Sequence, residues 1–349
     1  MERLIKASLL LLTVFLIASC GGSKSTGSPK GRPAWMDNPA AAYPERNFLS
    51  ARGAGDSREA AENNASGNLA KIFKSEITVD QTTRERYSAI TKMSGSMQEE
   101  LQTDMDQIVK VLAGETLFNV KFSNSYTDDM GRVHVLAYLD RRETAGIYEE
   151  KINANYDRIA FLNEQLETIS DPVSRYAVLN AAYTVSQINK ALLDQLNFIN
   201  ATSYSMLITG KEDLSYSVLG KKLTDAAKLL TFSVSFAGDD GRVASMTSET
   251  ISKMGFPIVQ NNAVVKINGE IRYEDVDLKR ENMEFVGWNL DLNVIGPDGS
   301  TFVHIDAKGR EGGVSKEAAK RIALREIGKN VGKKLEKELT AYFDTRLVK

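Results

Sequence analysis

The chain has 349 residues, with 44 Lys and Arg, 46 Asp and Glu, two His, one Cys and 42% hydrophobic residues. The near balance of charge argues against a basic nucleic-acid-binding protein, and the hydrophobic content argues against a disordered chain. One Cys excludes an internal disulfide, and together with His134 and His304 it cannot supply the four ligands of a structural zinc site. We expect no cofactor, although this count of Cys and His does not exclude a metal bound by carboxylates. At about 100 to 200 residues per domain, the length predicts two folded domains.

The first twenty residues are typical of a bacterial lipoprotein signal. Two basic residues, Arg3 and Lys6, precede the apolar run 9–17, which is shorter than the roughly 20 residues that span a bilayer. The segment Ile17-Ala18-Ser19-Cys20 resembles the lipobox, whose Cys is acylated once the signal is removed. We expect cleavage of residues 1–19 and a lipid anchor on Cys20. The alternative is an ordinary cleaved signal with a Cys nearby by chance.

Residues 20–33 predict a lipidated Cys followed by a flexible tether, because the segment is rich in Gly, Ser, Lys and Pro. Gly21 and Gly22 follow the Cys, whereas an Asp there would resemble an inner-membrane retention signal. Its absence favours the outer membrane. Removing residues 1–19 changes the formal charge from −2 to about −3.

The region 34–147 is predicted to be an α+β domain. Ser57 is the expected N-cap of a helix that carries Ala61, Ala65 and Leu69. The other expected elements are strands 48–52, 77–83, 117–126 and 133–139, helix 97–112, and turns 53–56 and 128–131.

The region 148–200 is predicted to be a long antiparallel helical hairpin. From Tyr148 to Ile169, and again from Val178 to Ile199, apolar residues step by three and four, which is coiled-coil spacing. Asp171-Pro172 interrupts the pattern at a position suited to helix entry. The hairpin is either an intramolecular brace or a zipper that binds a partner.

The region 201–349 is predicted to be a second α+β domain that ends in a long helix capped by Ser315. The segment from Gly309 to the Ala pair after Ser315 echoes the segment from Arg52 to the Ala pair after Ser57, so both domains are expected to share a strand-to-capped-helix unit. The other expected elements are helices 214–230 and 243–253, strands 231–236, 264–273, 284–295 and 301–308, and turns 238–241 and 296–299.

The search for catalytic residues finds only weak candidates. Gly53-x-Gly55-x-Ser57 could cradle an anion on a helix N-terminus, but a tight structural turn explains it as well. His134 and His304 each lie in an alternating strand without a nucleophile motif nearby. The paired carboxylates are expected in turns or on helix surfaces, at 99–100, 128–129, 149–150 and 239–240. We therefore expect no enzymatic activity.

Two segments are candidate binding surfaces. The C-terminal helix carries a basic residue at every fourth position, where it could meet an anionic lipid, a cell-wall polymer or an acidic partner, or could simply be solvated. These basic residues are Arg321, Arg325, Lys329, Lys333 and Lys337. Near the N-terminus, Trp35 and Tyr43 form an aromatic and proline segment that either packs on the first domain or lies in a partner's groove.

Several motifs resemble the LPP-twenty (LPP20) lipoprotein family. They are Pro33-Ala-Trp35-Met-Asp-Asn38-Pro39, Tyr43-Pro44, the segment from Phe48 to Ala60, and a closing strand from Val133 to Arg141. Together they frame residues 33–150. The resemblance implies a small α+β domain of a bacterial envelope lipoprotein, and the family offers no catalytic residues to transfer. The second half, through Phe232 to Phe236, Gly255-Phe256 and Val264 to Gly269, is similar to the N-terminal domains of TolB and to LpoB, an activator of penicillin-binding proteins.

The sequence thus predicts a non-enzymatic outer-membrane lipoprotein, periplasmic or surface-exposed, that acts as an envelope binding or scaffold module. Its expected partners are the membrane, through Cys20, and an envelope protein, and not nucleic acid. The alternative is an LpoB-like activator of a cell-wall synthase.

Overall fold

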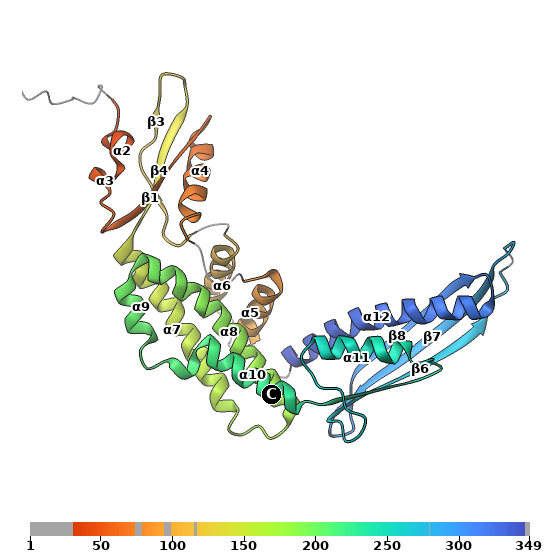
Figure 1. Ribbon diagram of the computed structural model, residues 1–349. Helices are drawn as coiled ribbons and strands as arrows, with labels where there is room; N and C mark the ends of the chain where they lie inside the picture. The colour runs from red at the N-terminus through yellow and green to blue at the C-terminus, as the bar shows by residue number, and fades with distance from the viewer. Residues whose placement is uncertain (1–30, 74–78, 94–98, 115–116, 279, 346–349) are drawn as a thin grey trace, which may run out of the picture.

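The computed structural model describes residues 31–73, 79–93, 99–114, 117–278 and 280–345. An N-terminal sheet, a helical middle and a C-terminal sheet follow one another, and the molecule bends between the helical middle and the second sheet (Figure 1). The predicted signal peptide, Cys20 and most of the predicted tether lie outside the described residues. Helices and two separate sheets confirm the predicted α+β class.

The first sheet is built around its central strand. Its strands are β1 (Phe48–Gly55), β2 (Lys121–Phe122), β3 (Tyr126–Thr127) and β4 (Val133–Asp140), and its helices are α2 (Ala34–Asp37), α3 (Pro39–Ala42) and α4 (Arg58–Ala70). Strand β4 pairs antiparallel with each of the other three. Because side chains alternate along β4, Ala137 and Leu139 join the core under α4, whereas Leu136 packs with Trp35 and Met36 of α2.

Three predictions for this region are wrong. Residues 81–83 open helix α5 (Gln81–Met93) and not a strand, because Asp80 accepts the Thr83 N–H at 2.7 Å and begins a helix there. Only the short strands β2 and β3 lie near the predicted strand 117–126. Gly53 and Gly55 belong to β1 and not to a turn. The predicted helix 97–112 matches α6 (Glu99–Leu112) over the described residues.

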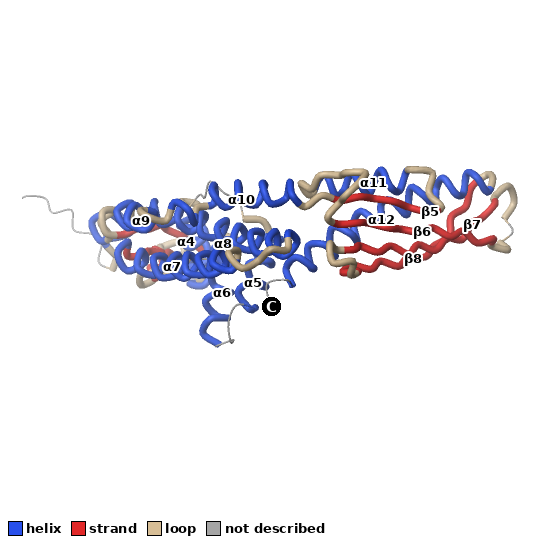
Figure 2. Tube along the Cα trace, turned by 90° about the horizontal axis from the view of Figure 1, so that it is seen from below, coloured by secondary structure: helices blue, strands red, loops and turns tan. Residues whose placement is uncertain are grey.

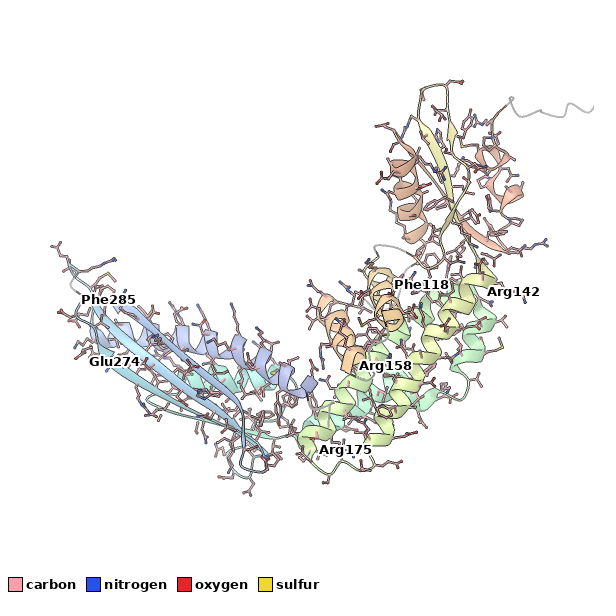
Figure 3. All side chains as sticks on the ribbon, turned by 180° about the vertical axis from the view of Figure 1, so that it is seen from behind. Phe118, Arg142, Arg158, Arg175, Glu274 and Phe285 are labelled. Carbon is pink, nitrogen blue, oxygen red and sulfur yellow. The ribbon has the colours of Figure 1, made fainter. Side chains whose placement is uncertain are left out.

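The helical middle contains the two long helices that the apolar spacing predicts. They are α7 (Arg141–Gln165) and α8 (Pro172–Ile199), followed by α9 (Ala201–Ile208), the 3-10 turn η1 (Glu212–Leu214) and α10 (Tyr216–Leu229). The side chain of Asp171 accepts the N–H groups of Val173 and Ser174, and Pro172 occupies the first helical position. Arg175 closes the turn before α8 by donating from Nη1 to the Leu166 carbonyl at 2.9 Å (Figure 3).

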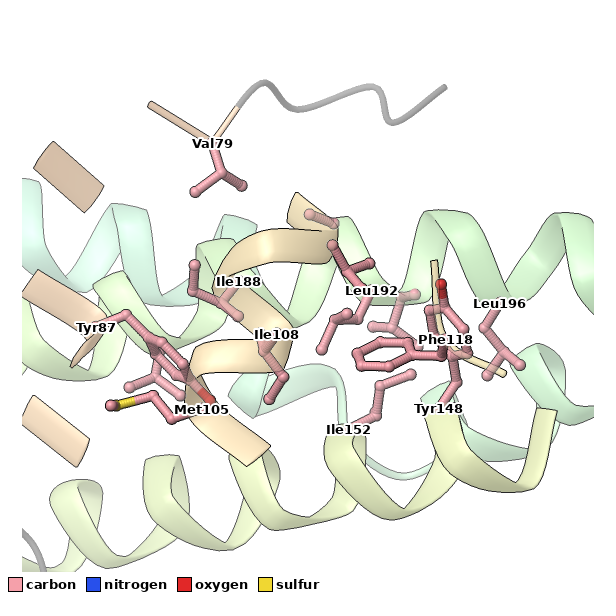
Figure 4. Close-up of a cluster of buried hydrophobic side chains, with 14 of the residues drawn as sticks. Val79, Tyr87, Met105, Ile108, Phe118, Tyr148, Ile152, Ile188, Leu192 and Leu196 are labelled. Atoms are coloured by element: carbon pink, nitrogen blue, oxygen red, sulfur yellow. The ribbon is translucent and has the colours of Figure 1, made fainter. Parts of the chain in front are cut away.

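One hydrophobic core joins the first sheet to these helices. Figure 4 shows part of it, where Tyr87 and Met105 from α5 and α6 meet Ile188 of α8, and Phe118 lies against Tyr148 of α7. In α8, 19 of the 28 residues are buried. The hairpin therefore packs within the protein, as an intramolecular brace does. The predicted domain division at residues 148 and 200 stays a prediction, and this core draws side chains from both sides of residue 148.

The second sheet has the order β5-β6-β7-β8, with the first pair parallel and the others antiparallel. Its elements are β5 (Phe232–Ala237), β6 (Val265–Asp275), β7 (Glu284–Ile295) and β8 (Thr301–Gly313), with helices α11 (Arg242–Lys253) and α12 (Lys316–Thr345). Both helices lie along one face of the sheet (Figure 2). Alternating apolar side chains such as Ile267, Leu290 and Ile305 fill the space beneath them.

The start of α8 joins the two halves of the molecule. Tyr176 belongs to the second core, with its ring centroid 4.9 Å from those of Phe256 and Phe343. Arg86 of α5 forms an ion pair of 2.9 Å with Asp344 near the end of α12. The described end of the chain therefore lies at the junction (Figure 1).

Candidate functional site

The basic residues of α12 all lie on its solvent side. Apolar residues such as Leu324, Val331 and Leu335 are buried against the sheet, whereas Arg321, Arg325, Lys329, Lys333 and Lys337 are exposed. Four residues turn a helix about 40° beyond a full turn, so these five cations wind around the exposed side and do not form one straight line. Only neighbouring members can bind the same small anion.

A groove opens where α12 begins, beside the start of α11. Its lining residues are Asp240, Gly241, Arg242, Ser245, Met246, Ala318, Arg321, Ile322 and Arg325, and its volume is about 800 Å³. The two helices come closest further along. A Cβ on Gly328 would lie 2.5 Å from the Sδ atom of Met246, and one on Gly332 would lie 2.9 Å from Oγ1 of Thr250. The groove lies at the starts of α11 and α12, before the two helices come this close together.

Three arginine side chains dominate the charge of this groove. Arg242 lies 3.5 Å from Asp240, and Arg325 lies 3.4 Å from Glu326, with both arginines well exposed. Within the described part of the chain, no ion pair engages Arg321. Exposed pairs of this kind contribute at most about 1 kcal/mol, so an incoming anion can compete for these arginines.

The helix ends beside the groove are already occupied. Asp239 accepts the N–H groups of Val243 and Ala244 at 3.1 and 2.9 Å, and Ser315 accepts the N–H of Ala318 at 3.2 Å. Asp239 and Asp240 thus cap α11, which is the turn role expected for this acidic pair. Any anion affinity of the groove must come from the arginine side chains and not from free backbone N–H groups.

Further along α12 the lysines differ in their surroundings. Lys329 pairs with Glu326 at 3.2 Å, and the pKa of the Glu326 carboxyl is lowered chiefly by its hydrogen bond to Lys329. Among the residues that the structure describes, no ion pair involves Lys333 or Lys337. The second half of the helix therefore exposes two lysines that no carboxylate of the described residues engages in an ion pair.

Trp35 and Tyr43 cover the outer face of the first sheet. Trp35 is only 6% exposed and packs on Leu136, and the Arg52 guanidinium donates to the carbonyl of neighbouring Met36 at 2.8 Å. The Tyr43 ring lies 4.4 Å from that of Tyr138. Burial raises the pKa of the Tyr43 phenol. The aromatic segment packs on its own domain, so a partner's groove could take Trp35 only after displacing it.

The weak catalytic candidates have structural roles. A Cβ on Gly53 would lie 2.2 Å from the Ala65 backbone nitrogen, so the glycine lets α4 approach the strand and does not cradle an anion. His134 Nε2 lies 2.7 Å from Asp128 Oδ2 beside a hairpin turn, and His304 Nδ1 lies 3.0 Å from Asn293 Oδ1 on the open sheet face. Across the described residues, no group of three His, Cys, Asp or Glu side chains is arranged to hold a metal ion.

The sequence reasoning missed Arg242. It lies some eighty residues before Arg321 in the chain, and the two meet only because α11 and α12 share one face of the sheet. The spacing of basic residues within α12 carries no signal for a cation on another helix. Cys20, the predicted lipid anchor, lies outside the described residues.

The comparisons with known proteins agree with the sequence motifs. Residues 33–140 match the model of the LPP20 lipoprotein family, which confirms the resemblance over this region. Residues 33–140 are thus related to a family of lipoproteins, and that family is not known for enzymatic activity. No match was found among the curated proteins. In the described part of the chain, no helix is both long enough and apolar enough to cross a bilayer.

Two solved structures are similar in part. A minor lipoprotein from Acinetobacter baumannii is 9% identical, with a TM-score of 0.26, and the match covers 32% of this chain and 92% of that one. The secreted protein HP1454 from Helicobacter pylori is 13% identical, with a TM-score of 0.41, and the match covers 82% of this chain and 95% of that one. Both TM-scores lie below 0.5.

Proposed function

We propose that this protein is a non-enzymatic outer-membrane lipoprotein, anchored through an acylated Cys20, that binds an envelope protein and acts as a scaffold. The match to a lipoprotein family and the lipobox-like segment before Cys20 support the anchor. Several acyl chains hold a protein on a membrane, where a single chain holds it only marginally. The tether after Cys20 then lets the folded domains stand off the lipid surface.

The observation that carries the binding role is the exposed basic surface formed by α12 and the start of α11. Arg242, Arg321 and Arg325 share one groove, and Lys333 and Lys337 extend the positive surface along the same helix. The whole chain has a formal charge of −2, so this positive surface differs from the average charge of the protein. Guanidinium groups bind carboxylates in a bidentate geometry, so the favoured partner is an acidic segment of an envelope protein.

The proposal is tested by crosslinking in intact cells followed by mass spectrometry. The test variant is Arg321→Glu combined with Arg325→Glu, and the matched control is Lys221→Glu combined with Lys222→Glu, which makes the same charge change on exposed residues of α10. We expect the native protein and the control to capture the same envelope proteins, and the test variant to lose most of them because the groove becomes negative.

Other outcomes would change the assignment. A Cys20→Ala form that stays on the outer membrane with its partners would refute the anchor. Capture by all variants alike would refute the groove as the binding surface. If the test variant loses crosslinks to anionic lipid or to a cell-wall polymer and keeps its crosslinks to proteins, the partner is that lipid or polymer. Capture and stimulation of one cell-wall synthase would replace the scaffold role by that of an activator.

A further inference from the structure

Strand β8 forms one edge of the second sheet (Figure 2). Among the described strands only β7 pairs with it, so the backbone groups on its other side point away from the sheet. With 13 residues it is the longest of the described strands. A long open edge can pair with another extended chain, and proteins usually cover or interrupt such an edge.

The edge strands β1 and β5 show how this chain covers other sheet edges. On β1, the carbonyls of Arg52 and Ala54 each accept a hydrogen bond of 2.9 Å from an asparagine side chain of α4. At the start of β5, the backbone N–H and carbonyl of Phe232 form two hydrogen bonds of 2.8 Å with the segment 257–259. Both edges are therefore partly closed from within the chain.

A lysine of α12 reaches the edge of β8. Lys334 Nζ donates to the Asp306 carbonyl at 3.3 Å, which shows that this carbonyl points outward from the sheet. Because the direction of backbone groups alternates along a strand, those of His304, Lys308 and Arg310 point outward as well. Lys334 is exposed, so its side chain can leave the edge without opening the core. The edge of β8 is therefore available for backbone pairing.

The open face of β8 carries charges that the sheet itself does not balance. Asp306 lies directly opposite Asp291 of β7, and like charges in opposed positions destabilise a sheet. Lys308 lies opposite Asn289. Among the described residues, neither Asp306 nor Lys308 belongs to an ion pair, and both are exposed. Each can therefore take a partner of opposite charge from outside the sheet.

Antiparallel pairing with a second β8 balances these charges. Ala307 is the central residue of β8, and pairing is regular from Val303 onward, so a pair centred on Ala307 joins residues 303–311 of both copies. In this register Asp306 lies opposite Lys308 of the second copy, and Lys308 lies opposite Asp306 of the second copy. Sliding one strand by two residues in either direction opposes two Asp306 or two Lys308 side chains. Charge complementarity therefore selects the register that also centres the strands.

We infer that β8 pairs antiparallel with β8 of a second copy of this chain, so that the two sheets of four strands become one continuous sheet. A two-fold axis through Ala307, perpendicular to the sheet, relates the copies, and each edge closes the other. The pairs from His304 to Arg310 exchange about eight backbone hydrogen bonds. The α12 helices of both copies then lie on the same face of this sheet. The inference does not depend on the proposed scaffold role, because it concerns the sheet edge and not the groove.

The test is the mass of the full chain in detergent micelles, measured by sedimentation in a detergent whose density matches the solvent. We expect a dimer that dissociates on dilution. Asp306→Lys and Lys308→Asp should each weaken the dimer by about tenfold or more, because each change opposes like charges at two symmetry-related positions. The variant with both changes should regain the native dimer, because the two charges are only exchanged. A monomer at every concentration, or a dimer that neither single change weakens, would overturn the inference.

Two controls separate pairing from folding and from total charge. In protein diluted to the monomer, Asp306→Lys should melt no lower than the native chain, because it removes the repulsion with Asp291. Lys266→Asp makes the same charge change as Lys308→Asp on the open face of the inner strand β6. It should keep the native dimer, and an equal loss in this variant would refute the β8 edge as the contact.

A cysteine at the two-fold axis tests the register. Ala307→Cys places two thiols opposite each other, because opposed Cα atoms lie about 4.5 to 5.5 Å apart, which is within the range of a disulfide. Oxidation in intact cells should link two chains of this variant. Ala237→Cys makes the same change on the other edge strand, β5, and should not link. Cys20 is the one natural cysteine, so the native protein is oxidised in parallel. Equal linkage in both variants, or linkage of Ala307→Cys to a different protein, would contradict the pairing.

Discussion

The two sheet domains join a strand to its covering helix in the same way and then present different surfaces to solvent. In β1 and α4, a Cβ on Gly55 would lie 2.8 Å from the Ala61 nitrogen, and Ser57 caps the helix. In β8 and α12, a Cβ on Gly313 would lie 2.5 Å from the Ala319 nitrogen, and Ser315 caps the helix. Helix α4 has 13 residues, whereas α12 has 30 and carries the exposed cations.

This comparison separates the residues that build the joint from those that distinguish the domains. A glycine facing small residues and a serine cap are enough to seat a helix on a strand. The outer face of that helix is then free to vary without disturbing the joint. The basic surface of α12 is therefore a property of the second domain alone.

The largest effect is expected where the two domains are connected. Tyr176→Ala should lower the free energy of unfolding by about 3 to 5 kcal/mol, because it leaves a cavity between Phe256 and Phe343. We also expect one thermal transition in the native protein and two in this variant, since α8 contributes to both cores. Differential scanning calorimetry measures both effects.

Two further variants bracket the effect at this junction. Tyr176→Phe keeps the ring and should remain close to the native stability. Phe198→Ala removes a ring from the same helix at a position that is 46% exposed, and it should cost less than about 1 kcal/mol. An unsplit transition at the native temperature in Tyr176→Ala would show that the two domains are coupled by other contacts.

The next effect tests the joints themselves. Gly53→Ala and Gly313→Ala should each cost about 2 to 3 kcal/mol, because the new Cβ meets backbone atoms that cannot rotate away. Urea unfolding followed by circular dichroism measures the loss. Gly67→Ala within α4 is the control. A Cβ there meets nothing within 4 Å, so this variant should gain about 0.5 to 1 kcal/mol. A tolerated Gly53→Ala would mean that α4 can shift along the strand.

Much of the fold could be predicted from local patterns. The spacing of apolar residues placed α7 and α8, and Asp171-Pro172 marked the start of α8 correctly. Strand β7 matched its predicted range because its two faces differ, one packed under α12 and one in solvent. The repeated Gly and Ser pattern also pointed to the shared joint, although Gly53 was assigned to a turn.

Most of the misses involve contacts between distant segments. The segment 77–83 alternates like a strand, yet Asp80 caps a helix that begins at Gln81 and whose apolar face packs on α6 and α8. The small residues Ala61 and Ala65 on α4 were a usable signal for the role of Gly53, since a close approach requires small groups on both sides. The groove at Arg242 had no such signal, because α11 and α12 must both pack on the second sheet before its lining residues meet.

A smaller effect is expected at the helix caps. Ser57→Ala and Ser315→Ala should each cost about 1 kcal/mol, because the Ala60 and Ala318 N–H groups lose their acceptors. Replacement by Asp at either position keeps an acceptor and should restore most of the stability. Chemical unfolding of the four variants gives the comparison. A cost at Ser57 alone would show that α12 is held by its packing on the sheet and not by its cap.

The smallest effect concerns the pH response of the hairpin turn between β3 and β4 in the first domain. The pKa of the Asp128 carboxyl is lowered first by its hydrogen bond to His134 and then by the N–H groups of Arg132 and Met130. An acid with a lowered pKa in the folded state stabilises the fold above its unfolded pKa, and this contribution is lost as the pH falls below the usual value of 3.8.

Asp128→Asn removes the titration, so its stability should change less than that of the native protein between pH 6 and pH 3. Urea unfolding at both values checks this, and Asp129→Asn, which changes the neighbouring residue of the same turn, should retain the native dependence. Equal pH dependence in the native protein and Asp128→Asn would show that the carboxyl gains nothing from the folded turn.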